Sequence, residues 1–253
     1  SQSRQAQLMY RYFRDHGYAC ASVNYRLAQE AAFPAAVEDV KSAIRFLRAN
    51  AEKYGYDPEQ FVIWGESAGG YLSVICGASN DEEFNGVPFI GEDESHPVSS
   101  EVQVILDYYG CMEFGTMNED YKTLKIPGIV RWAASLWLQG AIKGTGYEDV
   151  ESYWMRKDVK KLTEDEKNNY SPLYYIEKNL TKENSPDILI WHGDADLDVP
   201  YLQSERLHAL LTRIVGTDKV EFKLFHNYKH AADQLYSDEN LGILKEYLDE
   251  KFA

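Results

Sequence analysis

The ten residues Phe61–Gly70 (FVIWGESAGG) decide how this chain is expected to fold. They open with an apolar run, Phe61–Trp64, which is typical of a buried strand. The next five residues, Gly65–Gly69 (GESAG), match the pattern G-x-S-x-G, and Tyr71–Ile75 then continues as a helix. The pattern alone arises by chance in roughly one chain in ten of this length. A strand before it and a helix after it are the context in which the serine hydroxyl is held above the edge of a sheet.

Short apolar runs elsewhere predict the other strands of that sheet. These runs are Tyr18–Tyr25 (YACASVNY), Val102–Tyr109 (VQVILDYY), Ile188–Trp191 (ILIW) and Val220–Phe225 (VEFKLF). Helices are expected between most of them; one opens at Pro34, and another, Leu241–Phe252, closes the chain. Strands that alternate with helices predict an α/β fold, with a mostly parallel sheet covered by helices on both faces.

The interval between Gly110 and Asp187 interrupts this alternation, because it contains no convincing strand pattern. We expect one domain over residues 1–253 that carries a mostly helical, cap-like insertion at about residues 111–170. Such an insertion would lie over the carboxyl ends of the strands, where α/β sheets bind ligands. Its three tryptophans, Trp132, Trp137 and Trp154, either shape a pocket or serve packing.

Composition excludes several classes of function. The net charge of −15 disfavours nucleic acids and anionic membrane surfaces as partners. No apolar stretch is long enough to predict a transmembrane helix. The three cysteines, Cys20, Cys76 and Cys111, lie far apart and form no metal-binding pattern with histidine. We therefore expect reduced thiols, a cytoplasmic protein, no metal and no organic cofactor; the oligomeric state is left open.

A serine hydroxyl needs a base, and the base needs an orienting carboxylate. In this type of fold the order along the chain is serine, acid, histidine. Three candidate acids, Asp194, Asp196 and Asp198, follow the strand Ile188–Trp191, and spacing does not choose among them. Two candidate bases, His226 and His230, follow the strand Val220–Phe225. We favour His230, because it lies beyond a loop from which it can swing back over the serine.

The remaining histidines are expected to have no catalytic role. His192 lies too close to its strand and precedes the acids, so it is interpreted as a structural hydrogen-bonding residue. The other three, His16, His96 and His208, have no supporting pattern and are interpreted as solvated or satisfied side chains.

These motifs together resemble the α/β-hydrolase esterases of the hormone-sensitive-lipase and BD-FAE-like group, which includes feruloyl and acetyl esterases. The resemblance covers nearly the whole chain, is specific at the serine turn and the acid loop, and is loose in the insertion. The matching residues are Tyr25–Ala28 (YRLA), Phe33–Ala36 (FPAA), Asp57-Pro58, Gly65–Gly70 (GESAGG), Ser171-Pro172, and His192-Gly193 with Asp196 and Val199-Pro200.

Carried over residue by residue, the resemblance implies Ser67 as the nucleophile, Asp196 as the acid and His230 as the base. It thereby chooses the acid that spacing leaves open. The backbone N–H of Ala68 would belong to the oxyanion hole. Tyr109 and Val199 are the expected substrate-binding residues. Members of the group hydrolyse carboxylic esters, mostly of short or aromatic acyl groups.

Two departures from the family pattern stand out. Around the base, the family often has a glycine-rich approach, and here the residues are Asn227–Lys229. The family also carries a His-Gly-Gly loop before its first large helix, and this chain begins just after the corresponding position. In the family's sheet, the strand before that loop lies between the runs Tyr18–Tyr25 and Phe61–Trp64. We therefore expect the natural protein to have an N-terminal segment, without which the site is a weak enzyme, and we expect these two runs not to pair directly.

Three functions remain open at this point. The first is a serine carboxylesterase that acts on short-chain or carbohydrate-linked esters through an acyl-enzyme. The second keeps the same three residues but cleaves an amide or peptide bond, as in prolyl-peptidase catalytic domains. The third is a non-catalytic binding module with a hydrolase fold. The expected partner in the first reading is a small-molecule ester.

Overall fold

The computed structural model describes residues 3–93, 95–130, 140, 142–148 and 150–253. A four-stranded sheet lies at its centre, in the order β1-β2-β3-β4. The strands are β1 (Val62–Glu66), β2 (Val104–Tyr108), β3 (Asp187–Gly193) and β4 (Val220–Phe225). Every neighbouring pair is parallel, and Glu66 of β1 lies level with Tyr108 of β2 and Trp191 of β3. The carboxyl ends of the strands therefore share one edge of the sheet.

These strands confirm the predicted α/β fold and four of the predicted apolar runs. All five residues of β2 are buried, as expected for a strand with a neighbour on each side and helices on both faces. Successive residues of β2 face opposite sides: Ile105 belongs to one hydrophobic core, and Leu106 belongs to the other.

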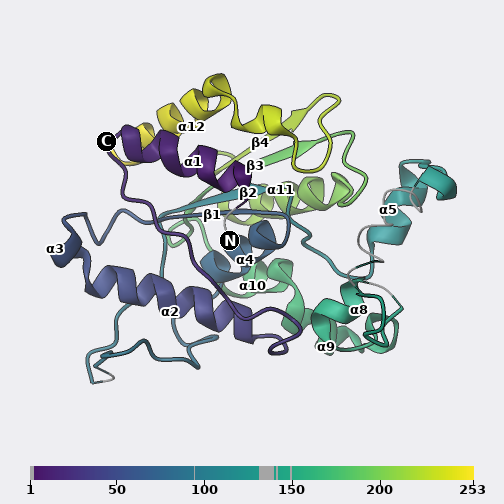
Figure 1. Ribbon diagram of the computed structural model, residues 1–253, viewed down its shortest axis with the longest axis horizontal. Helices are drawn as coiled ribbons and strands as arrows, with labels where there is room; N and C mark the ends of the chain where they lie inside the picture. The colour runs from purple at the N-terminus through teal and green to yellow at the C-terminus, as the bar shows by residue number, and fades with distance from the viewer. Residues whose placement is uncertain (1–2, 94, 131–139, 141, 149) are drawn as a thin grey trace.

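Helices cover both faces of the sheet (Figure 1). The described helices are α1 (Arg4–Asp15), α2 (Ala35–Ala49), α3 (Ala51–Tyr54), α4 (Ala68–Ala78), α5 (Met117–Thr123), α8 (Val150–Met155), α9 (Glu164–Tyr170), α10 (Pro172–Asn179), α11 (Leu202–Val215) and α12 (Asp238–Lys251), with the 3-10 helices η1 (Val159–Lys161) and η2 (Asp233–Tyr236). Residues of α2, α4, α10 and α11 build the first core, and residues of α1, η2 and α12 build the second. The result is the helix–sheet–helix arrangement that the alternating pattern predicts.

The predicted strand at Tyr18–Tyr25 is wrong, because these residues belong to no strand of the described structure. Their side chains nevertheless alternate between the two cores: Tyr18 and Cys20 pack against the second, and Val23 and Tyr25 against the first. Apolar alternation sets which way side chains point, but a strand also needs a neighbour that supplies backbone hydrogen bonds. Among the described residues β1 pairs with β2 only, so the run 18–25 and β1 are not directly paired. An intervening strand stays a prediction.

The interval predicted as an insertion contains only helices and loops among its described residues. In Figure 1 α5, α8 and α9 lie at one end of the molecule, to the side of the sheet. Trp154 of α8 packs edge-on against Phe114, with ring centroids 6.3 Å apart, whereas Trp132 and Trp137 lie outside the described residues. The role of this interval as a cap stays a prediction.

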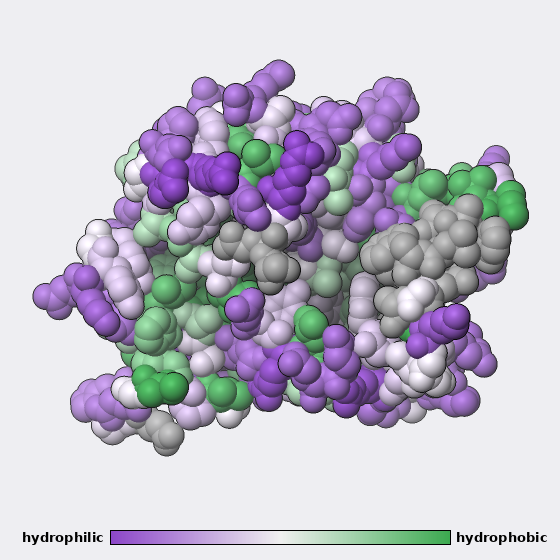
Figure 2. Space-filling model, in the orientation of Figure 1, coloured by the Kyte–Doolittle hydropathy of each residue, from purple (hydrophilic) through white to green (hydrophobic). Residues whose placement is uncertain are grey.

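Hydrophilic residues cover most of the visible surface (Figure 2). A band of hydrophobic surface lies between α1 and α2 in the same view. Among the helices that the structure describes, none combines the length and the apolar character needed to cross a membrane.

Candidate active site

The turn between β1 and α4 carries Ser67 and has the geometry that the G-x-S-x-G pattern demands. Ser67 has φ 54° and ψ −115°, a conformation that a residue with a side chain rarely adopts. Its own N–H donates to the carbonyl of Tyr108 at 2.9 Å, which ties the turn to the end of β2. Strain of this kind costs about 1–3 kcal/mol and persists where the surrounding structure over-determines it.

Two glycines make this turn sterically possible. A Cβ on Gly65 would lie 2.0 Å from the carbonyl oxygen of Gly69, and a Cβ on Gly70 would lie 2.3 Å from Asp107 Oδ1. A Cβ on Gly69 would meet nothing within 4 Å. The close approach of α4 to β1 and β2 therefore explains Gly65 and Gly70, and steric exclusion does not explain Gly69.

The structure brings Ser67, His230 and Asp196 together from three separate loops. His230 Nε2 lies 3.1 Å from Ser67 Oγ, and His230 Nδ1 lies 2.7 Å from Asp196 Oδ2. Asp196 lies in the acid loop, residues 194–200 after β3, and His230 lies in the base loop, residues 226–232 after β4. The other carboxylate oxygen of Asp196 accepts backbone N–H groups of Asp198 at 2.8 Å and Val199 at 2.9 Å. Both oxygens of the acid are thus held in place.

Burial and charge set the protonation of this group. Burial opposes ionisation of Asp196, but hydrogen bonds from His192 and His230 outweigh it and hold the pKa of this carboxyl well below its usual range. Burial also opposes protonation of His230, yet the hydrogen bond and charge of Asp196, with the charges of Asp198 and Glu66, raise its pKa above 6.5. An ionised acid beside a base that is ready to accept a proton is the electrostatic arrangement that nucleophilic catalysis requires.

His192 supports the acid from the side opposite to His230. It is fully buried, and its Nε2 lies 3.0 Å from the carbonyl of Val199 and 3.4 Å from Asp196 Oδ2. A carbonyl can only accept, so Nε2 carries the proton, and the Ser204 hydroxyl faces Nδ1 at 2.7 Å. His192 is therefore the structural hydrogen-bonding residue that the sequence predicts, and Asp196 is the group that it contacts.

The alternative acid and base form a second pair. His226 Nδ1 lies 2.7 Å from Asp194 Oδ2, and the N–H of Asn227 donates to Asp194 Oδ1 at 2.6 Å. The side chain of His226 is 83% exposed, and the pair joins the acid loop to the base loop at the surface. Asp198 contributes its N–H to Asp196. Of the five candidate acids and bases, only Asp196 and His230 are joined to Ser67 by hydrogen bonds.

The predicted oxyanion residue lies at the start of a helix, whereas the two predicted substrate-binding residues are buried. Ala68 is the first residue of α4, where N–H groups have no acceptor inside the helix and the helix dipole favours negative charge. Tyr109 and Val199 are 1% and 5% exposed, so neither side chain is open to a substrate in this structure. Their direct contact with substrate stays a prediction; what the structure gives for Tyr109 is a ring contact with His230, at 4.8 Å between centroids.

Several residues near the site were not anticipated. Glu66 accepts hydrogen bonds from the phenols of Tyr109 and Tyr236. Tyr121 of α5 donates its hydroxyl to the carbonyls of Leu197 and Asp198 in the acid loop. Glu66 stands inside the G-x-S-x-G motif and could have been singled out there, whereas the partnerships of Tyr121 and Tyr236 join residues far apart in sequence and leave no local pattern.

The same α5 is fixed to α11 by a charged cluster. Asp120 is 4% exposed and accepts both terminal nitrogens of Arg206, at 2.6 and 2.7 Å, and the amide of Gln203 at 2.7 Å. A bidentate guanidinium–carboxylate pair fixes geometry as well as charge. The start of the predicted insertion is therefore anchored beside the acid loop.

The histidines interpreted as non-catalytic have local partners. His16 contacts the carbonyl of Tyr12, His96 contacts Asp93, and His208 lies 3.4 Å from Thr212 Oγ1. None of Cys20, Cys76 and Cys111 forms a disulfide in this structure. In the part of the chain that the structure describes, no group of His, Cys, Asp and Glu side chains is arranged to hold a metal ion.

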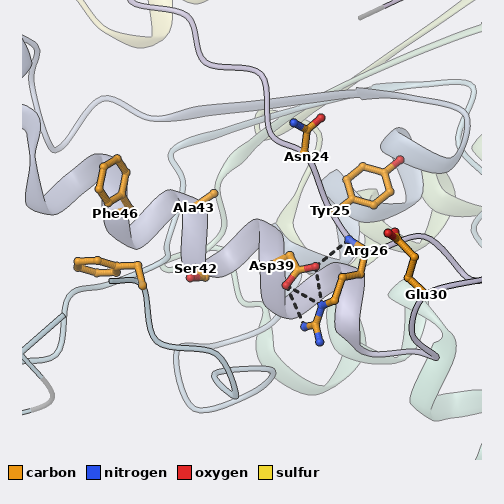
Figure 3. A pocket seen from close by; sticks show the side chains of 9 residues that line it. Asn24, Tyr25, Arg26, Glu30, Asp39, Ser42, Ala43 and Phe46 are labelled. Atoms are coloured by element: carbon orange, nitrogen blue, oxygen red, sulfur yellow. Dashed lines mark hydrogen bonds and ion pairs between the residues drawn. The ribbon is translucent and has the colours of Figure 1, made fainter. Parts of the chain in front are cut away.

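A surface hollow of about 580 Å³ lies away from these residues. Figure 3 shows its lining from residues 24–30 and from α2, with Arg26 turned towards Asp39. Arg26 Nε lies 3.0 and 2.9 Å from the two Asp39 oxygens, so its charge is already paired. None of Ser67, Asp196 and His230 lines this hollow, and we assign it no part in the chemistry.

Known proteins of similar sequence include esterases. Esterase LipQ of Mycobacterium tuberculosis is 27% identical over 86% of this chain, and Esterase LipC of the same organism is 27% identical over 79%. The chain spans 43% of the length of each of these relatives.

Solved structures share the fold. A truncated carbohydrate esterase from gut microbiota superposes with a TM-score of 0.66 and 25% identity, covering 91% of this chain and 73% of that one. A bifunctional GH43-CE protein of Bacteroides eggerthii gives 0.73 and 24%, covering 98% of this chain and 31% of that one. The sequence profile of the BD-FAE family matches residues 1–211. The chain therefore belongs to the BD-FAE family of α/β-hydrolase esterases.

Proposed function

We propose that this protein is a serine carboxylesterase that hydrolyses short-chain or carbohydrate-linked carboxylic esters through an acyl-enzyme. The observation that carries the proposal is the hydrogen-bonded chain from Ser67 Oγ through His230 to Asp196, with contacts of 3.1 and 2.7 Å. The names of the relatives support an ester as the bond that is cleaved. The carbohydrate esterase of similar fold supports a sugar as the alcohol.

In the proposed acylation step, Ser67 Oγ attacks the ester carbonyl while His230 Nε2 takes the hydroxyl proton. The carbonyl oxygen becomes an oxyanion and accepts a hydrogen bond from the N–H of Ala68 at the start of α4. Asp196 holds the imidazole through Nδ1 and stabilises its positive charge. The intermediate then collapses: the ester C–O bond breaks, and His230 returns the proton to the leaving alcohol.

Hydrolysis of the acyl-enzyme reverses these roles. Water enters where the alcohol left, His230 Nε2 takes one of its protons, and the remaining hydroxide bonds to the acyl carbon. Collapse of the second intermediate releases the carboxylic acid and returns the proton to Ser67 Oγ. The proposed mechanism uses only these residues and water in both steps, and it requires no cofactor.

The test compares bond classes on the natural full-length protein. Initial rates are measured with p-nitrophenyl acetate, acetylated xylo-oligosaccharides, methyl ferulate and an aminoacyl p-nitroanilide, with Ser67→Ala as the blank. The proposal predicts ester hydrolysis that Ser67→Ala abolishes and little or no cleavage of the anilide. Preferential cleavage of the anilide would instead support an amide or peptide hydrolase, and inactivity on every substrate would support a binding module.

A further inference from the structure

A cluster of three oxygens lies beside the proposed base and is not used by the mechanism above. Glu66 Oε2 lies 2.6 Å from the hydroxyl of Tyr236 and 3.0 Å from the hydroxyl of Tyr109. The two phenol oxygens are themselves 2.9 Å apart. The other carboxylate oxygen, Oε1, accepts the hydroxyl of Ser3 at 2.9 Å. The carboxylate is thus fixed at both of its oxygens, one residue before the nucleophile.

The hydroxyls of Tyr109 and Tyr236 are the proton donors in this cluster. Burial raises the pKa of both Tyr109 and Tyr236, and the charge of Glu66 raises each further, so both rings stay neutral. Two phenol protons serve three oxygen–oxygen contacts. The shortest contact, from Tyr236 to Glu66, holds one proton, and the proton of Tyr109 is directed to Glu66 or to Tyr236.

The anchored phenol of Tyr109 places its ring against the proposed base. The ring centroids of Tyr109 and His230 are 4.8 Å apart, with planes inclined at 66°. The Tyr109 backbone is also fixed, because its N–H donates to the carbonyl of Trp191 at 2.8 Å. A ring held at both its backbone and its hydroxyl cannot turn away, and it limits the movement of the imidazole that it contacts.

The charge of Glu66 also acts on this imidazole, because Glu66 directly precedes Ser67, whose Oγ lies 3.1 Å from His230 Nε2. Three carboxylates act on His230: Asp196 and Asp198 from the acid loop and Glu66 from the end of β1. Among the described residues no lysine, arginine or histidine forms an ion pair with Glu66; the hydrogen-bond partners of its carboxylate there are the hydroxyls of Ser3, Tyr109 and Tyr236. Besides Ser3 and the two phenols, Glu66 also faces Tyr25, whose pKa is raised mainly by burial and further by this charge.

We propose that Glu66 is a positioning residue for His230: it anchors the ring of Tyr109 against the imidazole, and its charge favours the imidazolium that forms when Ser67 loses its proton. This inference rests on the proposed ester hydrolysis, in which His230 is the base. It differs from a purely structural role of the Glu66–Tyr109–Tyr236 cluster, which would affect folding stability and leave the titration of His230 unchanged.

The experiment measures the pKa of His230 directly, by NMR titration of its imidazole in the wild-type protein and in Glu66→Gln. The resonance is assigned by its loss in His230→Gln. Glutamine keeps the size and an acceptor oxygen but removes the charge, so we expect the pKa to fall by about half a unit to one unit. Glu66→Asp keeps the charge and should keep the pKa close to that of the wild type. The matched control is Glu52→Gln on α3, beyond the amino end of β1, which should change nothing.

Enzyme kinetics provide a second test of the proposal. Glu66→Gln should lower kcat/KM for p-nitrophenyl acetate by about tenfold and move the acidic limb of its pH profile to lower pH. Tyr109→Phe keeps the ring and the charge but frees the ring, so kcat should fall severalfold with KM within about twofold.

The outcomes separate the two proposals. An unchanged His230 pKa in Glu66→Gln overturns the inference, whatever the activity. If Glu66→Gln does not fold, an unchanged kcat in Tyr109→Phe overturns it instead. A wild-type protein that hydrolyses no ester contradicts the proposed function, but the NMR titration still decides whether Glu66 acts on His230.

Discussion

Two histidine–aspartate pairs join the acid loop to the base loop, and they differ in burial rather than in contact distance. Both Nδ1–Oδ2 distances are 2.7 Å. In the buried pair, His230–Asp196, the side chains are 14% and 1% exposed. In the exposed pair, His226–Asp194, they are 83% and 27% exposed. Equal contacts therefore lie in very different surroundings.

The surroundings determine what each pair can do. Water competes for the groups of an exposed pair and screens their charges, so such a pair adds little. A buried carboxylate cannot regain its hydration when its partner is lost, which makes the buried pair sensitive to any change. Only the buried pair continues to Ser67. Burial and reach thus distinguish a proposed catalytic pair from a surface contact with the same geometry.

The largest expected effect comes from breaking the buried pair. Asp196→Asn keeps the size of the side chain but can no longer hold His230 in the required tautomer, so kcat should fall by about 10⁴-fold. The measurement is the rate of p-nitrophenyl acetate hydrolysis. Asp194→Asn, the same substitution in the exposed pair, is the matched control and should keep kcat within about threefold. Equal losses in both variants would contradict the distinction drawn here.

The next effect is a pH dependence with opposite signs for activity and stability. Because the pKa of His230 is raised above 6.5, activity should fall about tenfold per pH unit below that raised value, where the base is protonated. Stability should change the other way: a raised pKa contributes stability below about 6.5 that is lost as the pH rises through the folded value. Profiles of kcat/KM and of the melting temperature, each compared with His230→Gln, test both signs. Parallel profiles would count against this assignment.

A smaller effect is expected from the residue behind the acid. His192→Asn replaces the imidazole N–H with an amide N–H donor on a shorter side chain, so Asp196 loses part of its support. We expect kcat to fall by about tenfold. His208→Asn on α11 is the matched control, because the contacts of His208 are with Thr212 and Phe222 and not with the acid. An activity equal to that of the wild type would show that His230 and the backbone alone hold the carboxylate.

The smallest effect concerns the exposed pair itself. His226→Gln should keep kcat within about twofold and shift the melting temperature by no more than about 2 °C. Thermal denaturation and the ester assay measure both quantities. A large loss of activity would mean that the surface contact, with the Asn227–Asp194 hydrogen bond beside it, sets the position of the base loop.

The comparison also shows how far the sequence could lead. The strands at 62–66, 104–108, 187–193 and 220–225 follow from short apolar runs, because buried parallel strands need apolar residues on both faces. The run 18–25 has the same apolar character but pairs with no strand among the residues that the structure describes, and an apolar pattern contains no information about pairing partners. His230 could be favoured over His226 on reach alone. The choice of Asp196 over Asp194 and Asp198 needed the family resemblance, because burial is not visible in spacing.

The proposed positioning cluster was beyond prediction for the same reason. Glu66 stands in the motif, but its partners Tyr109 and Tyr236 lie 43 and 170 residues further along the chain. Such contacts arise only when β1, β2 and η2 are packed together. The sequence could indicate Ser67 as the proposed nucleophile, but not the groups that are proposed to tune its base.

The most direct test of the central claim is covalent labelling of the natural full-length protein with a fluorophosphonate, followed by mass spectrometry of its peptides. The account predicts one modified residue, Ser67, in wild-type protein and in Asp194→Asn, with labelling strongly slowed in Asp196→Asn and in His230→Gln. Absence of labelling at Ser67, or labelling at the same rate in Asp196→Asn, would contradict it.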